Sequence, residues 1–243
     1  VKVCTIWPSN STVAELAQVA RAGTVISLPY GTRASRILAR RTGAKMIQAP
    51  LPLGPGGTGR FIMAVASAMD RASQAEAFLR EERARWGAAF EFAASRLAGR
   101  RLVVVSDPWL AEATVELLEE AGATVAAAQS TAQHPKPVRG LPTAADVESL
   151  GPIDMFVVPT RGIDFALRHA KPFFEFGFTS FGTHAFFEAP VLGWGGSVNL
   201  LNSLSSSMAL FSMIEGSRDF DLRRLAVSMP GVAGTPEGRD RRG

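Results

Sequence analysis

Along the chain, short apolar runs alternate with longer stretches in which apolar residues recur at helical spacing. Apolar runs at 1–6, 24–29 and 44–50 predict strands in the first half. Helical spacing over 13–23 and 31–43 predicts the helices between them. Strands that alternate with helices in this way are typical of βαβ units, in which the strands are parallel.

Local signals mark where several helices begin. Thr12 and Glu15 have the spacing of a capping box, in which the hydroxyl and the carboxylate bind free amides of the first helical turn. A loop rich in Pro and Gly within 49–70 runs into an amphipathic helix, with Thr58 as its predicted N-cap. A longer helix is predicted over 73–99, because its acidic start and basic middle suit the helix dipole and side-chain pairing.

The strand and helix pattern restarts at Arg100. The run 101–106 predicts a buried strand, and Asp107 and Pro108 predict the N-cap and first residue of the next helix. Gly122 is predicted to end that helix. The remaining predictions are strands at 123–129, 153–160 and 171–178, helices at 161–170 and 197–215, and a long irregular connection at 130–146.

Together these elements predict an α/β protein with two Rossmann-like parallel-sheet domains. The first spans 1–99 and includes the long helix 73–99, which is expected to bridge the two domains. The second spans 100–216 and includes a C-terminal helix, and 217–243 form a tail.

Composition narrows the class of protein. A hydrophobic fraction of 47% and a charged fraction of 20% in 243 residues are those of a folded globular protein. No stretch offers the ~20 uninterrupted apolar residues of a membrane span, and no signal peptide is recognisable at the start. The single cysteine, Cys4, excludes an internal disulfide framework, predicts a cytoplasmic location and cannot alone supply the four thiolates of an iron–sulfur cluster.

The net charge of +4 is mild, and several basic residues lie within 33–41 and 237–243. We interpret the first cluster as one face of a helix and the second as a solvated tail. No nucleic-acid partner is therefore predicted.

Some motifs have simple structural explanations. The glycine-rich segment 52–61 lacks the lysine of a phosphate loop and the spacing of a dinucleotide-binding motif, so a sharp turn is favoured over a nucleotide site. Asp107 could bind a metal at the end of its strand, but a helix cap is favoured. His134 and His169 have polar neighbours and no ligand partner at metal-site spacing, and are predicted to be incidental.

The segment 175–202 is unusual because it combines phenylalanines and glycines in a turn-prone run before the final helix. His184 lies within this run, where no regular structure is predicted. Its ring could bind a ligand, donate a proton or be satisfied within the loop, and the residues alone leave these alternatives open. The run could also pack the final helix against the sheet.

Three segments, in this order, resemble the catalytic component-1 subunits of the nitrogenase superfamily. Residues 49–62 resemble the family's Pro-x-Gly-x-x-x-Thr-x-x-Phe turn, and 80–110 its Glu-Arg-x-Arg helix with the following strand that ends in Asp-Pro. Residues 173–204 resemble its closing segment of aromatic residues and glycines before a Leu-Leu helix. Family subunits have three α/β domains, and the resemblance covers only the latter two.

The resemblance implies that the aromatic segment lines a buried cavity, between the α/β domains, for a metal cluster or a tetrapyrrole. The implied catalytic residue is His184, and no metal ligand is assigned. An iron–sulfur or metal cluster is expected in the complete complex and none on the isolated chain, since the family's cofactor cysteine would fall near 28–30, where there is none. The implied cofactor-binding residues are Gly54, Thr58, Phe178, Phe181, His184, Gly193 and Gly195.

The function implied by the resemblance is that of a subunit or fragment of a nitrogenase-like oxidoreductase. Its partners would be a homologous component-1 subunit and an ATP-dependent iron–sulfur reductase that supplies the electrons. The alternative within the superfamily is a non-catalytic cofactor-assembly scaffold or partner subunit. A stand-alone Rossmann-like ligand-binding protein is supported by the fold pattern alone. The substrate could be dinitrogen, a tetrapyrrole or a methylthio compound.

Overall fold

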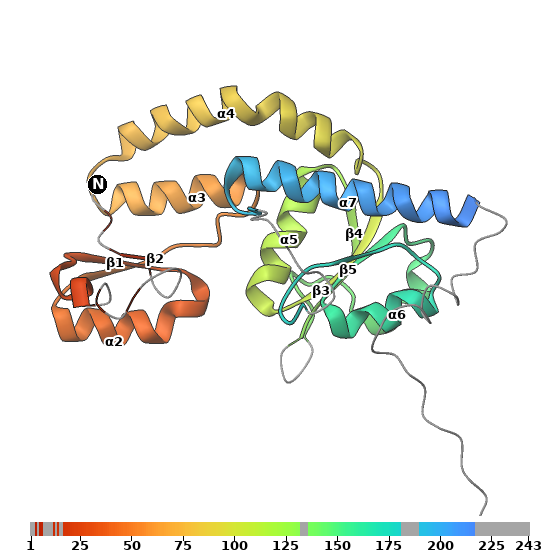
Figure 1. The fold of residues 1–243 in the computed structure, drawn as a ribbon, viewed down its shortest axis with the longest axis horizontal. Helices are drawn as coiled ribbons and strands as arrows, with labels where there is room; N and C mark the ends of the chain where they lie inside the picture. Colours follow the sequence, from red (N-terminus) through yellow and green to blue (C-terminus); the bar gives the residue numbers. More distant parts are fainter. Residues whose placement is uncertain are drawn as a thin grey trace, which may run out of the picture.

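The computed structural model of the protein describes residues 3, 5, 6, 12, 14, 17–131, 136–180 and 190–216. The chain forms two parallel sheets that are linked by long helices (Figure 1). This confirms the predicted fold class, in which both α/β units contain parallel strands. The domain division between residues 99 and 100 stays a prediction.

The smaller sheet pairs β1 (Thr24–Ser27) with β2 (Lys45–Gln48) in parallel. The chain crosses between them through the 3₁₀ turn η2 (Pro29–Gly31) and the helix α2 (Thr32–Thr42). α2 ends at Gly43, whose φ of 72° is left-handed, a conformation that glycine adopts without steric cost. The strands and the helix predicted for this part are confirmed.

The N-terminal predictions lie mostly outside the described residues. This applies to the strand at 1–6, to Cys4 and to the capping-box residue Glu15. Within the helix predicted over 13–23, residues 17–21 form a 3₁₀ helix, η1 (Ala17–Arg21).

Two helices lead from the smaller sheet to the larger one. α3 (Gly54–Ser67) and α4 (Ala72–Ser95) run next to each other; α3 lies over the smaller sheet, and α4 extends from there toward the larger sheet (Figure 1). The long helix predicted over 73–99 is present as α4, and its role as a bridge between two domains stays a prediction. The prediction that Thr58 caps α3 is wrong, because α3 begins at Gly54. The Thr58 hydroxyl instead donates a hydrogen bond back to the Pro52 carbonyl, 3.2 Å away.

The larger sheet is parallel throughout and has the strand order β4-β3-β5-β6. Asp107 caps the helix that follows β3, since its carboxylate accepts a hydrogen bond from the Leu110 amide, so the predicted cap is confirmed. The strands are β3 (Arg101–Ser106), β4 (Thr124–Ser130), β5 (Met155–Val158) and β6 (Phe173–Glu175). The helices of this half are α5 (Pro108–Glu120), η3 (Ala144–Leu150), η4 (Thr160–Gly162), α6 (Ile163–Arg168) and α7 (Gly193–Gly216).

Apolar residues fill both faces of the larger sheet, as expected for parallel strands covered by helices on both sides. Phe156 in β5 is fully buried and its ring contacts those of Phe165 and His169. The expectation that His169 has only polar surroundings is therefore wrong. Its ring centroid lies 4.7 Å from that of Phe165, on one side of the sheet.

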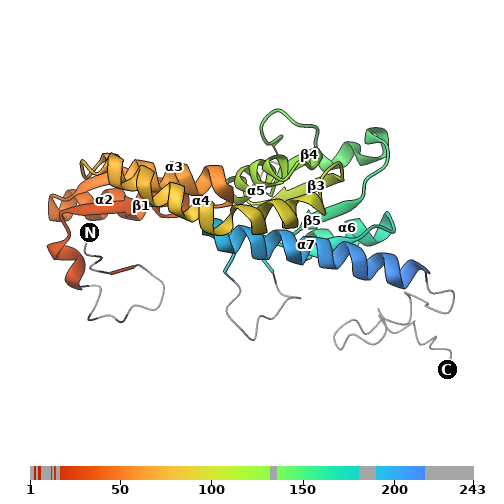
Figure 2. The same cartoon turned by 90° about the horizontal axis from the view of Figure 1, so that it is seen from above.

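The last helix, α7, covers the opposite face. It begins at Gly193, four residues before the predicted start at Ser197, and lies beside α4 (Figure 2). Leu200, Leu201 and Leu204 are almost fully buried in this contact and join the core of the larger sheet. None of the helices in the described ranges is long and apolar enough to cross a membrane.

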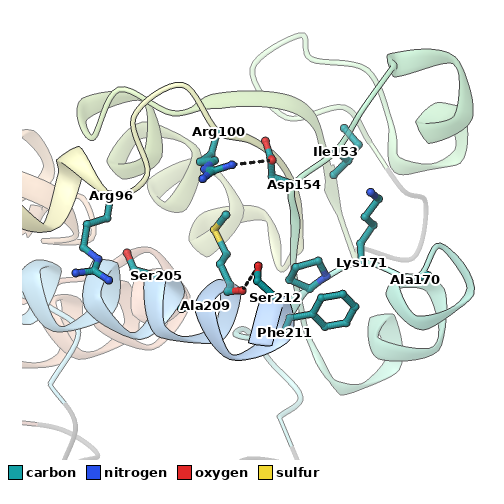
Figure 3. A pocket seen from close by; sticks show the side chains of 12 residues that line it. Arg96, Arg100, Ile153, Asp154, Ala170, Lys171, Ser205, Ala209, Phe211 and Ser212 are labelled. Atoms are coloured by element: carbon teal, nitrogen blue, oxygen red, sulfur yellow. Dashed lines mark hydrogen bonds and ion pairs between the residues drawn. The ribbon is translucent and has the colours of Figure 1, made fainter. Parts of the chain in front are cut away.

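A cavity of about 480 Å³ lies at the amino edge of the larger sheet (Figure 3). It is bounded by residues that immediately precede β3, β5 and β6 and by the C-terminal half of α7. Open α/β sheets bind ligands at the carboxyl edge. In the larger sheet that edge lies at the opposite ends of the strands from this cavity.

Candidate functional site

The carboxyl edges of the two sheets approach each other. Tyr30 belongs to η2, which follows the carboxyl end of β1, and Asp107 directly follows β3. The Tyr30 hydroxyl donates a hydrogen bond of 2.6 Å to Oδ1 of Asp107. A side chain from one sheet therefore reaches the strand ends of the other, which are the ends used for ligand binding in open α/β folds.

Tyr30 is a neutral hydrogen-bond donor at this edge. Partial burial, the hydrogen bond to Asp107 and the charge of that carboxylate raise the pKa of Tyr30 above its ordinary value. A phenol of ordinary pKa is already protonated at neutral pH, so the raised pKa extends to higher pH the range over which Tyr30 donates this hydrogen bond. Oδ1 of Asp107 accepts from both Tyr30 and the Leu110 amide, so this carboxylate oxygen has an established structural role.

A second set of polar groups lies at the ends of β5 and β6. The Thr160 hydroxyl donates a hydrogen bond to the Glu175 carboxylate, and the Thr160 amide donates one to the Thr179 carbonyl at 3.1 Å. Ser106, at the end of β3, is 1% exposed, and its Oγ has no hydrogen-bond partner among the described residues. A Cβ atom on Gly177 would lie 2.5 Å from this Oγ, so glycine permits the close approach of the two segments.

The predicted aromatic site begins at this same edge. Phe178 follows β6 by three residues and is 77% exposed, which is unusual for a large apolar side chain. Phe181 and His184 lie outside the described residues, so their predicted roles stay predictions.

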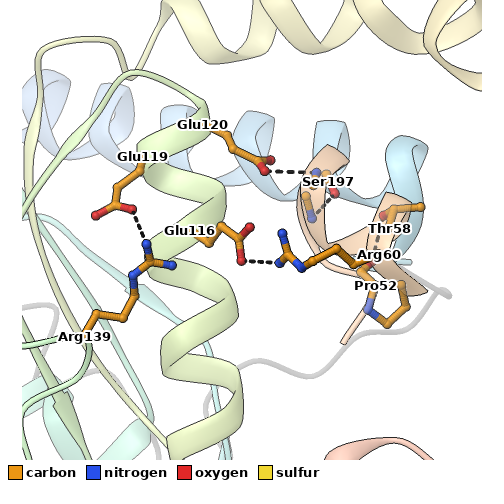
Figure 4. A network of polar contacts seen from close by, with 10 residues as sticks. Pro52, Thr58, Arg60, Glu116, Glu119, Glu120, Arg139 and Ser197 are labelled. Atoms are coloured by element: carbon orange, nitrogen blue, oxygen red, sulfur yellow. Dashed lines mark hydrogen bonds and ion pairs between the residues drawn. The ribbon is translucent and has the colours of Figure 1, made fainter. Parts of the chain in front are cut away.

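The predicted glycine-rich turn forms a compact polar junction between α3, α5 and α7 (Figure 4). The Gly54 amide donates to Ser197 Oγ at 2.9 Å, and the Gly56 amide donates to Glu120 Oε1 at 3.0 Å. The Gly193 amide and the Thr58 hydroxyl both donate to the Pro52 carbonyl. The structure therefore brings together Gly54, Thr58 and Gly193, three of the predicted site residues.

In this junction the N-terminus of α3 binds side chains of two other helices. Free amides at a helix start attract anions, and here a hydroxyl of α7 and a carboxylate of α5 already bind two of them. The interpretation of this segment as a sharp turn, rather than a nucleotide-binding loop, agrees with these contacts.

Comparison with known proteins decides the family. The family model for nitrogenase component 1 type oxidoreductases matches residues 1–209. The chain belongs to this family. No curated protein matches the chain.

Two solved structures of nitrogenase Cp1 share the fold of this nitrogenase component-1-type chain. The structure at pH 6.5 has a TM-score of 0.68 at 19% identity, covering 86% of this chain and 50% of the Cp1 chain. The structure at pH 5 has a TM-score of 0.66 at 14% identity, covering 85% and 51% of the two chains. The chain spans about half the length of the Cp1 chains that it matches.

The component-1 family implies a metal cluster, and the donor atoms of the described residues can be tested against one. No group of three or more His, Cys, Asp or Glu side chains within the described ranges is arranged to hold a metal ion. At the carboxyl edge, the carboxylates of Asp107 and Glu175 are already hydrogen-bonded. The described residues of this edge therefore do not fit cluster ligation, and Cys4 and His184 lie outside them.

Two glycines of the family's closing motif have packing roles in α7. A Cβ atom on Gly195 would lie 3.0 Å from the Trp86 ring of α4, and one on Gly196 would lie 2.5 Å from the Val191 carbonyl carbon. Glycine at these positions lets α7 approach α4 and its own preceding segment. The predicted cofactor contact of Gly195 stays a prediction.

Sequence reasoning missed Tyr30, Glu120 and Ser197 as members of these sites. Tyr30 and Asp107 are separated by 77 positions, and Gly56 and Glu120 by 64. No local pattern marks any of the three residues, because their partners come from other elements of the fold.

Replacing Glu120 with glutamine is expected to remove part of the pH dependence of stability. Partial burial of the carboxyl and the nearby charge of Glu116 raise the pKa of Glu120, although its bond from the Gly56 amide and the charge of Arg60 act the other way. A carboxyl with a raised folded-state pKa favours the folded state at low pH, and this contribution is lost as pH rises through that pKa.

Thermal unfolding between pH 4 and pH 7.5 measures this effect. Glu120→Gln should become more stable relative to the wild type as pH rises. Glutamine keeps an oxygen that accepts the hydrogen bond from the Gly56 amide, but it does not become charged. Glu119→Gln removes an equal charge from the same helix end and should keep the wild-type trend. Parallel curves for wild type and Glu120→Gln would contradict the assignment.

Proposed function

We propose that this component-1-type chain is part of a nitrogenase-like oxidoreductase complex. In this complex it would accept electrons from an ATP-dependent iron–sulfur reductase and help to deliver them to a substrate. The observation that carries the proposal is the contact between Tyr30 and Asp107, which brings together the carboxyl edges of both sheets in a chain of this family. Ligands of open α/β folds bind at such edges.

Further parts of the complex would complete the site. The chain spans about half of the matched Cp1 chains, so a homologous component-1 subunit is a proposed partner that completes the cavity and the redox groups. Exposed apolar side chains on the C-terminal half of α7 support such an assembly, among them Leu210 and Met213 at 59% and 74% exposure. We place the complex in the cytoplasm, since a protein with one cysteine does not depend on disulfides.

The residues of this chain would shape the cavity and move protons. Phe178 and Phe181 would exclude water from the substrate, which strengthens electrostatic effects on the reacting group. His184 would donate a proton to the substrate or hold it in place. Tyr30, which keeps its proton, would hold the two edges at a fixed separation through Asp107.

Paired measurements of turnover and unfolding on the complete complex test this proposal. His184→Ala should lower turnover by roughly 10²-fold or more, the usual contribution of a positioned acid or base, without loss of folding. Phe178→Ala should lower turnover while changing the free energy of unfolding by less than about 0.5 kcal/mol, as exposed side chains do. Phe92→Ala, exposed on α4, is the matched control and should change neither.

Turnover that is unchanged in both His184→Ala and Phe178→Ala would contradict the proposed cavity. A complex that retains a cofactor but transfers it to another protein, without turnover of its own, would instead identify the alternative role of an assembly scaffold.

A further inference from the structure

The smaller sheet and the elements around it have a one-sided charge. Residues 17–69 contain seven Arg and Lys side chains and no Asp or Glu, although the net charge of all 243 residues is only +4. Four of the seven lie in α2 and are exposed: Arg33, Arg36, Arg40 and Arg41. Figure 1 shows α2 on the side of the smaller sheet away from α3 and α4. Positive charge therefore gathers on one outer side of the protein.

The four arginines share one face of the helix. Arg33, Arg36 and Arg40 are spaced i, i+3, i+7, which places them in one row along α2. Ile37 lies between this row and Arg41, because it is a helical neighbour of Arg33, Arg40 and Arg41 at three or four positions. Its side chain is 50% exposed. These four arginines and Ile37 are called the basic face below.

No described carboxylate balances the basic face. Within the described ranges, each ion pair involves an arginine outside α2, namely Arg60, Arg100 or Arg139. The elements that α2 packs against are β1, β2, η1 and η2, and none of them contains an acidic residue. The charge of the basic face is therefore open to an external partner.

Helix stability explains only part of this arrangement. Arg40 and Arg41 lie in the last turn of α2, where cations interact favourably with the helix dipole. Arg33 lies in the first turn, where a cation is unfavourable. Arg36 is three residues from Arg33 and four from Arg40, and like charges at these spacings repel. The basic face therefore weakens α2 as a helix, which points to a use outside the fold.

Ile37 indicates which kind of partner fits. Protein interfaces combine an apolar centre with a polar rim and are enriched in arginine. Nucleic acids bind mainly through phosphates, which offer Ile37 no apolar contact. A helix on a membrane surface inserts a broad apolar face, whereas α2 packs against β1 and β2. An acidic protein surface is therefore favoured over a nucleic acid and a membrane.

A second copy of this chain is a poor match for the basic face. The acidic residues of α5 have the required helical spacing, but they already have partners within the chain. Glu116 pairs with Arg60, and Glu119 pairs with Arg139. The Glu120 carboxylate accepts a hydrogen bond from a backbone amide of α3. The partner is therefore expected to be a different protein.

We propose that the basic face docks a protein whose contact surface carries carboxylates around an apolar side chain. Guanidinium groups bind carboxylates through two parallel hydrogen bonds, which gives arginine an advantage over lysine. Ile37 would pack against the apolar side chain at the centre. The proposal rests on the charge and shape of α2 and does not require the proposed oxidoreductase function.

Calorimetric titration of the full-length protein at low ionic strength tests the proposal, with a short helical peptide in which glutamates surround one leucine as the probe. Arg36→Glu should weaken peptide binding at least about tenfold, since hydrogen bonds between charged groups are the strong ones. The thermal midpoint of Arg36→Glu should stay equal or rise, because the new carboxylate lies four residues before Arg40. Arg83→Glu, exposed on α4, makes the same charge change and should bind the peptide as the wild type does.

A second variant tests the apolar part of the contact. Ile37→Gln leaves the charge unchanged and should weaken binding of the peptide but not binding of duplex DNA. No measurable peptide binding by the wild type would overturn the proposal, as would equal affinities of Arg36→Glu and Arg83→Glu. Unchanged peptide binding by Ile37→Gln would also overturn it. Tighter binding to duplex DNA, or to vesicles of phosphatidylserine and phosphatidylcholine, than to the peptide would replace the protein partner with a nucleic acid or a membrane.

Discussion

Replacing Phe156 with alanine is expected to lower the free energy of unfolding by about 3–5 kcal/mol, the usual effect of removing a large side chain from a core. Phe156 is 0% exposed in the second strand from the edge of the larger sheet. Its ring lies 5.5 Å from that of Phe165 and 5.9 Å from that of His169, so truncation also removes ring contacts.

Denaturant unfolding of Phe156→Ala and Phe92→Ala measures this difference. Both variants make the same chemical change, but Phe92 is 66% exposed on α4 and should change stability by less than about 0.5 kcal/mol. Equal effects of the two substitutions would contradict the assignment of Phe156 to the core of the larger sheet.

Replacing Gly196 with alanine is expected to cost about 1–3 kcal/mol, as overpacking does. The added Cβ atom would lie 2.5 Å from the carbonyl carbon of Val191 and 3.0 Å from its Cα. Both atoms belong to backbone, so the segment before α7 must move. That segment follows residues 181–189, which contain the predicted catalytic His184, and turnover should therefore fall together with stability.

Gly59→Ala provides the matched control for this substitution. Gly59 lies inside α3 with open space where its Cβ would be, so alanine should stabilise the protein by roughly 0.5–1 kcal/mol. The two glycine substitutions should thus have opposite signs in the same unfolding experiment. A stabilising Gly196→Ala would show that α7 and the segment before it do not pack as described.

Elements with local signals were predictable from the sequence. The strand at 101–106 and the helix that starts at Pro108 have the predicted positions, because Asp107 and Pro108 are neighbours of the helix that they start. The start of α3 was mispredicted for the opposite reason. Its first amides bind Ser197 and Glu120, which come from other helices, so α3 extends back to Gly54 beyond the local signal at Thr58.

In the candidate site, too, contacts between elements that are distant in sequence could not be predicted. Family motifs led to Gly54, Thr58 and Gly193, which the fold brings together at one junction. Thr58 and Gly193 donate to the Pro52 carbonyl, and Gly54 donates to Ser197 of α7. Tyr30 and Asp107 could not be paired from sequence, since only the arrangement of two separate sheets makes them neighbours. Periodicity predicts which face of an element is buried, but it does not predict which strand ends meet.

We propose above that this component-1-type chain works in a complex that accepts electrons from an ATP-dependent iron–sulfur reductase. Stopped-flow absorbance of the reduced reductase, mixed with ATP and the complete complex, tests it without knowledge of the substrate. We expect the reductase to be reoxidised rapidly only when both ATP and the complex containing this chain are present. Reoxidation no faster than that of the reductase with ATP alone would contradict it.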